Sequence, residues 1–133
     1  MKGLDTNVLV RFLAQDDVKQ SAQATRYIAK HCTVEDPCCI GLVTLCELVW
    51  VLESHYARGR DDIAAVIEHV LETGELDITE SLTVRKALAD FKRSNVEFPD
   101  HLIARVNAQA GCEATATFDK KAAKQPDFEL LRV

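Results

Sequence analysis

The hydrophobic and polar residues of this chain follow two periods, and together they predict helices that alternate with very short strands. Apolar residues at helical spacing predict helices over about 8–13, 18–31, 43–56, 63–73, 80–92 and 101–110. Short apolar or alternating runs predict strands at 3–4, 38–40, 76–78, 112–118 and 128–133. Strands that are connected through helices pair in parallel with right-handed crossovers. The pattern therefore predicts an α/β fold.

Length and composition indicate a single domain over residues 1–133. The 133 residues are 47% hydrophobic and 28% charged, which is an ordinary balance for a globular protein with its own core. We expect a mostly parallel sheet of four or five short strands with helices on both faces. No apolar run approaches the roughly 20 residues that span a bilayer, and no signal sequence is recognisable, so we expect a soluble protein.

Charge and cysteine content restrict the possible functions. The net charge of -5 argues against a protein that coats nucleic acid by charge alone. The five cysteines are an odd number without a C-x-x-C pair, which predicts reduced, buried thiols and a cytoplasmic location. His31, Cys32, Cys38 and Cys39 do not have the spacing of the recurrent zinc sites.

Asp5 follows the first short strand and precedes the first helix. It has two interpretations, because Asp is a common helix N-cap and because ligands of open α/β sheets bind at the carboxyl ends of the strands. Asp119 follows the strand that ends at Phe118. In a parallel sheet both strand ends lie at one edge, so we expect Asp5 and Asp119 to be neighbours.

Two further acids stand out by their surroundings. Glu47 is the one carboxylate in the apolar run from Leu42 to Leu52, so it should be ion-paired, protonated, or directed at a polar cavity or a metal. Asp100 follows Pro99 at the start of a predicted helix, where capping is the alternative interpretation. Four acids at one sheet edge would repel one another unless a hard cation neutralised them, and oxygen ligands select Mg²⁺ or Mn²⁺.

Four stretches carry these acids in order: LDTNVLVRFL at 4–13, LCELVWVL at 45–52, FPDHLIARVNAQAGC at 98–112 and TFDKK at 117–121. Through them the chain resembles the PIN-domain nucleases, which have a three-layer α/β/α fold, and among these the VapC-type toxins of prokaryotic toxin–antitoxin pairs. The resemblance implies a metal-dependent endoribonuclease, a homodimer, and a cognate antitoxin as partner.

The resemblance also assigns the site. Metal binding and catalysis would fall to Asp5, Glu47, Asp100 and Asp119, with Thr6, Asn7 and Thr117 in support. Where the family often has a further Asp three residues before Asp100, this chain has Glu97, which we do not assign to the site. Candidates to hold the RNA strand are basic: Arg11, Arg85, Lys86, Lys92, Arg93, Lys120, Lys121 and Lys124.

Two other functions compete with the nuclease. A phosphotransfer receiver-type domain also gathers acids at strand ends, but it would have an acid pair after the first strand and a lysine after the last. A catalytically silent PIN-like module would bind a partner without cleaving RNA. The presence of all four acids favours the enzyme.

Overall fold

In the computed structural model, which describes residues 1–133, the chain divides into two units, 1–81 and 82–133. The first contains α1 (Thr6–Ala14), α2 (Val18–His31), β1 (Cys38–Ile40), α3 (Leu42–Ser54), α4 (Arg60–Glu72) and β2 (Leu76–Ile78). From Ser81 onward follow α5 (Ser81–Lys92), α6 (Phe98–Gln109), β3 (Thr115–Thr117), the 3₁₀ helix η1 (Ala122–Lys124) and β4 (Phe128–Leu130).

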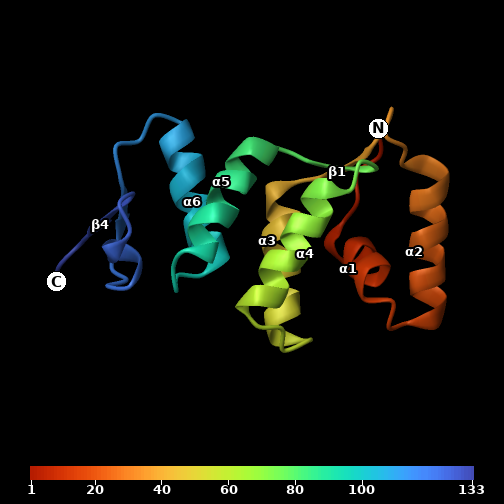
Figure 1. Cartoon of the computed structure of the whole chain (residues 1–133), viewed down its shortest axis with the longest axis horizontal. Coiled ribbons are helices and arrows are strands. Elements are labelled where there is room, and N and C mark those ends of the chain that lie inside the picture. The colour runs from red at the N-terminus through yellow and green to blue at the C-terminus, as the bar shows by residue number, and fades with distance from the viewer. The chain divides into compact units, whose positions relative to one another are not determined.

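The strands of the first unit pair in parallel. Cys38 lies opposite Leu76, and an isolated parallel bridge joins Gly3 to Cys39 on the other side of β1. The Leu4 amide donates to the Cys39 carbonyl at 3.0 Å, and the Cys39 amide donates to the Lys2 carbonyl at 2.7 Å. The N-terminus therefore runs beside β1 (Figure 1), which confirms the predicted strand end directly before Asp5.

Helices of the first unit bury one side each, as their apolar spacing predicts. Leu9 and Val10 of α1 are buried, and α1 and α2 lie side by side (Figure 1). In α3 the buried side chains are Leu45, Leu48, Val49 and Leu52, and in α4 they include Ile63, Ile67 and Val70. Burial of one large aliphatic side chain contributes roughly 1.5–3 kcal/mol, so this core holds the start of α1 in place.

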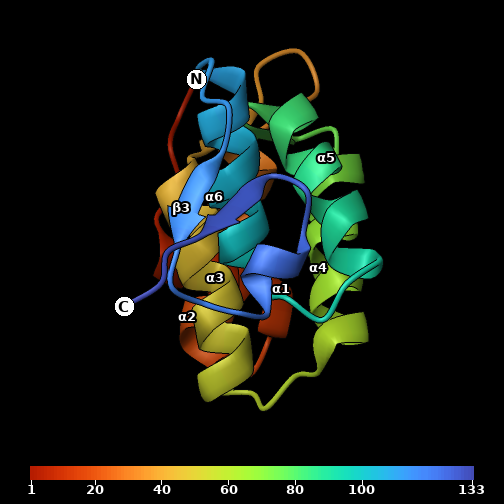
Figure 2. The same ribbon diagram turned by 90° about the vertical axis from the view of Figure 1, so that its left-hand side faces the viewer.

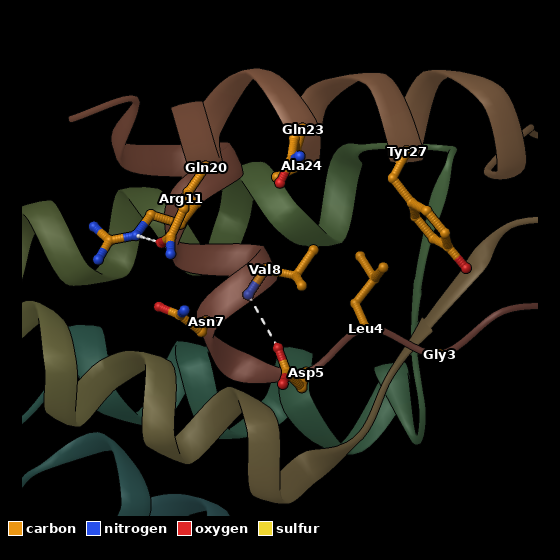
Figure 3. A pocket seen from close by; sticks show the side chains of 10 residues that line it. All are labelled: Gly3, Leu4, Asp5, Asn7, Val8, Arg11, Gln20, Gln23, Ala24 and Tyr27. Carbon is orange, nitrogen blue, oxygen red and sulfur yellow. Dashed lines mark hydrogen bonds between the residues drawn. The ribbon is translucent and has the colours of Figure 1, made fainter. Parts of the chain in front are cut away.

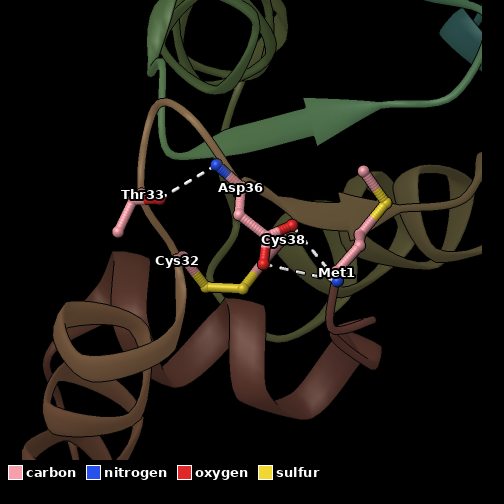
Figure 4. The surroundings of a disulfide bond; sticks show 5 residues. All are labelled: Met1, Cys32, Thr33, Asp36 and Cys38. Atoms are coloured by element: carbon pink, nitrogen blue, oxygen red, sulfur yellow. Dashed lines mark hydrogen bonds and ion pairs between the residues drawn. A yellow bond between two sulfur atoms is a disulfide. The ribbon is translucent and has the colours of Figure 1, made fainter.

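Cysteine chemistry differs from our prediction. Cys32, at the end of α2, and Cys38, the first residue of β1, form a disulfide with their Cα atoms 5.0 Å apart. The short connection turns back through hydrogen bonds between Thr33 and Asp36: the Asp36 amide donates to Thr33 Oγ1 at 2.9 Å, and the Thr33 amide donates to the Asp36 carbonyl at 3.1 Å (Figure 4). Asp36 also forms an ion pair with the Met1 amino group. The prediction that all five thiols are reduced is therefore wrong for this pair. The free cysteines Cys39, Cys46 and Cys112 are half-buried or exposed, not buried.

The second unit contains a second parallel pair. Thr115 of β3 lies opposite Phe128 of β4, and η1 lies in the connection between the two strands (Figure 2). The rings of Phe91 on α5 and Phe98 on α6 pack edge to face with centroids 5.9 Å apart. Arg105 on α6 donates two hydrogen bonds to the Asp90 carboxylate on α5, from Nε to Oδ2 at 2.6 Å and from Nη2 to Oδ1 at 2.9 Å. This bidentate contact joins α6 to α5.

Helices that alternate with short parallel strands confirm the predicted α/β class. The four strands form two separate pairs, and each strand is three residues long. Helix α6 begins at Phe98, earlier than predicted, because Pro99 occupies its first turn, where a missing N–H costs nothing. No helix of the structure has both the length and the apolar character needed to cross a membrane.

Candidate metal-binding site

Asp5 caps helix α1. Its Oδ1 accepts a hydrogen bond from the Val8 amide at 3.0 Å, and its backbone is extended as an N-cap requires. The capping interpretation is thus confirmed. A carboxylate has a second oxygen, however, and the exposed Asp5 side chain also lines a cavity between α1 and α2. Capping through Oδ1 is compatible with a further role through Oδ2.

Glu47 lies on the solvent side of α3. The buried residues Leu45, Leu48 and Val49 occupy the opposite side, so the apolar run that surrounds Glu47 in sequence does not enclose it in space. Glu47 instead lines a cavity of about 540 Å³ together with Thr6 and Asn7. The exposure of Glu47 excludes a buried ion pair and agrees both with an ordinary position at the edge of the helix and with a side chain directed at a cavity.

The cavities at Asp5 and Glu47 are neighbours within the first unit. Asn7 and Arg11 of α1 line both of them, so the cavity that contains Asp5 and the cavity that contains Glu47 share these two side chains. Two of the predicted supporting residues, Thr6 and Asn7, are therefore found beside the acids that they were expected to support. Their roles in metal binding stay predictions.

Asp100 lies in the first turn of α6, in the second unit, and its electrostatics are unusual. Burial raises the pKa of the Asp100 carboxyl above its ordinary value, the charges of Asp119 and Glu97 raise it further, and His101 lowers it. The positive end of a helix dipole normally favours a carboxylate at this position. Burial, and after it the charges of Asp119 and Glu97, outweigh that effect for Asp100.

Asp119 follows β3, as predicted, and its own backbone is fixed by a turn. Its amide donates to Thr117 Oγ1 at 3.0 Å, and its Oδ1 accepts from the Lys121 amide at 2.8 Å. The third predicted supporting residue, Thr117, thus holds the backbone at Asp119. Because Asp119 acts on the pKa of Asp100, the two predicted acids of this unit are close to each other.

The donor set suits a hard cation, although neither unit alone gathers three or more His, Cys, Asp or Glu side chains that could hold a metal ion. Asp5 and Glu47 belong to the first unit, whereas Asp100 and Asp119 belong to the second. Their convergence at one sheet edge stays a prediction. Carboxylate and amide oxygens with uncompensated negative charge fit Mg²⁺ or Mn²⁺ better than zinc.

Comparison with known protein families identifies the chain. The model of the PIN domain family matches residues 3–128. The chain belongs to the PIN domain family. Comparison with curated proteins and with solved structures gave no match. PIN domains are generally metal-dependent nucleases, and the match runs through all four predicted acids and through both units.

Two features of the site were not found from sequence. Glu97 was left unassigned, yet it acts on Asp100. Helix α2 was interpreted as a surface helix with one packing side, but Gln20, Gln23 and Tyr27 line the cavity that contains Asp5. The sequence does not reveal that amide and aromatic residues on a surface helix line a cavity, because such residues are equally common on helix faces that are simply exposed to solvent.

Proposed function

We propose that this PIN-domain protein is a Mg²⁺- or Mn²⁺-dependent endoribonuclease and the VapC-type toxin of a toxin–antitoxin pair. The observation that carries the proposal is the PIN-family match over residues 3–128, which contains all four acids. The pKa of Asp100, raised by burial and by the charges of Asp119 and Glu97, supports it. A perturbed carboxyl group beside other acids is typical of a functional site. In a nuclease family, such a group is suited to hold a cation against a phosphodiester.

Each of the four acids has a defined part in this proposal. Asp5, Glu47, Asp100 and Asp119 would hold the cation through carboxylate oxygens. A divalent cation, when bound, supplies a Lewis acid that polarises the phosphodiester and lowers the pKa of a bound water. Thr117 keeps Asp119 in position through its hydroxyl, which accepts from the Asp119 amide. No nucleophilic side chain is required for attack by a bound water.

An RNA cleavage assay tests the enzyme. Purified protein is incubated with a set of structured and unstructured RNAs in EDTA, Mg²⁺ or Mn²⁺, and cleavage is expected only with a metal. Asp100→Asn and Asp119→Asn should each reduce the rate at least about a hundredfold, since each replaces a charged carboxylate ligand of the cation with a neutral amide. Asp61→Asn is the matched control, because Asp61 lies in the first turn of α4 as Asp100 lies in the first turn of α6. Absence of cleavage across all RNAs and metals would favour the silent binding module.

Two partners belong to the toxin proposal. A small antitoxin, encoded beside the toxin, would bind near the acids and block RNA, and the active unit would be a homodimer. Co-expression with the product of the neighbouring gene should yield a stable complex that no longer cleaves RNA. Light scattering of the isolated protein should give twice the mass of one chain, and a monomer at micromolar concentration would contradict the dimer.

A further inference from the structure

The cavity between α1 and α2 has a volume of about 550 Å³ and is lined in part by Asp5 (Figure 3). Leu4 and Ala24 are 6% exposed each, so they form its apolar floor. Its polar lining comes from both helices: Asp5, Asn7 and Arg11 on the side of α1, and Gln20, Gln23 and Tyr27 on α2 (Figure 3). The volume is in the range of small-molecule sites and fits one or two nucleotides.

The lining combines three kinds of chemistry. The Tyr27 ring is partly exposed and packs against the His31 ring with centroids 4.5 Å apart, which restricts its orientation. Gln23 carries an amide that both donates and accepts hydrogen bonds. Arg11 contributes a cation at the side nearest Asn7. A flat ring, an amide and a guanidinium match the face, the edge and the phosphate of a nucleotide.

We propose that this cavity binds one unpaired nucleotide of the RNA, next to the phosphodiester that is cleaved at Asp5. This inference deepens the proposed nuclease function and rests on it. Tyr27 stacks on the base, Gln23 bonds to the edge of the base, and Arg11 contacts the adjoining phosphate. Only an unpaired base offers its face and edge together, so the nucleotide that this cavity holds must be unpaired.

Arg11 is oriented for this contact by its neighbours. Its Nε donates to Gln20 Oε1 at 2.8 Å and its Nη1 donates to Asp16 Oδ1 at 3.1 Å. The Tyr56 hydroxyl donates a hydrogen bond to Asp16 Oδ2 at 2.6 Å. This bond is the main reason that the pKa of Asp16 lies below its ordinary value, so Asp16 stays ionised beside Arg11. These bonds use two of the five N–H donors of a guanidinium, and the others can reach a phosphate.

The test measures binding of a fluorescent single-stranded RNA octamer to the full chain in EDTA, where a metal-dependent nuclease does not cleave. An octamer of the same length with abasic sugars serves as the matched ligand. Tyr27→Leu should weaken RNA binding about tenfold, as expected for one lost base–aromatic stack, and should leave abasic binding unchanged. Tyr27→Phe keeps the ring and should bind like wild type. Gln23→Ala is the second variant, and thermal unfolding checks that each variant is folded.

Lys30→Ala is the control for general charge, since Lys30 is exposed on the same helix and does not line the cavity. The inference is overturned if wild type does not bind the octamer, if Tyr27→Leu binds RNA like wild type, or if it loses abasic binding equally. It is also overturned if the variants lose a protein partner but keep RNA binding, since the cavity would then be a peptide site.

The outcome separates this inference from the proposed function. Wild-type protein that binds RNA with the expected dependence on Tyr27, but cleaves no RNA with Mn²⁺, would refute the nuclease and support the nucleotide site. Wild-type protein that cleaves RNA with Mn²⁺, while Tyr27→Leu binds and cleaves normally, would support the nuclease and refute the nucleotide site.

Discussion

Reduction of the Cys32–Cys38 disulfide should lower the free energy of unfolding by about 2 kcal/mol. The two residues are 6 positions apart. Applied to a loop this short, the chain-entropy relation gives about 2 kcal/mol at 25 °C for the denatured-state entropy that the cross-link removes. With a typical urea dependence of unfolding, this corresponds to a shift of about 1 M in the urea midpoint. The cross-link also fixes β1, which pairs with the segment that leads to Asp5.

Two measurements check this prediction. Alkylation in denaturant without reductant should label three cysteines, and alkylation after reduction should label five, as counted by intact mass. Urea unfolding should show the midpoint shift with reductant for wild type and for Cys112→Ala, whose thiol is free and exposed. Cys32→Ala combined with Cys38→Ala should be insensitive to reductant. Five labels without reductant, together with an unchanged midpoint, would refute the disulfide and restore the prediction of reduced thiols.

Three further predictions concern the acids. The pKa of Asp100 is raised in the folded state, so Asp100 contributes stability at acidic pH that is lost as the pH rises through that pKa. At pH 7 in EDTA, Asp100→Asn should therefore melt no lower than wild type. The variant should also gain less thermal stability from added Mn²⁺ than wild type does. Burial would raise the pKa of Asp90, but Arg105 lowers it below the ordinary value, so Asp90→Asn should cost about 2 kcal/mol at pH 7. Urea unfolding should show this difference begin to shrink below about pH 4 and disappear only as the pH falls through the lowered pKa of the folded state. Glu47→Gln should leave the melting temperature in EDTA unchanged, because Glu47 is exposed, and should abolish RNA cleavage; a destabilised but active variant would make Glu47 structural.

Much of the fold could be predicted from the sequence because its signals are local. Helix α2 and strands β1 and β2 have the predicted bounds, since aspartate caps, breaks at glycine and proline, and apolar spacing act within a few residues. The strand predicted at 112–118 is shorter, Thr115–Thr117, because its ends have no strand partner. Strand pairing is long-range, and propensity does not determine where it stops.

The sequence allowed us to name the candidate site residues but not to predict the surroundings of their side chains. The apolar run around Glu47 suggested a buried acid, yet the position of a residue around the helix axis decides its exposure, and Glu47 falls on the outer side of α3. The disulfide was missed for a related reason. Cysteine count and spacing give no distance, whereas the structure brings Cys32 and Cys38 to 5.0 Å between Cα atoms.

Of the four acids, Asp100 is the one that the fold alone explains least. Asp5 caps α1, Asp119 accepts from amides of its own turn, and Glu47 occupies an exposed helical position, so each would be compatible with an ordinary stable protein. Asp100 also occupies a favourable place, the first turn of α6, but burial, Asp119 and Glu97 reverse that advantage and raise its pKa. A local arrangement that lowers stability persists when it serves function. Under the proposed function, the raised pKa of Asp100 marks the place where a cation would relieve the most repulsion. A metal titration of Asp100→Asn against wild type tests this, because the variant should then gain less stability from Mn²⁺.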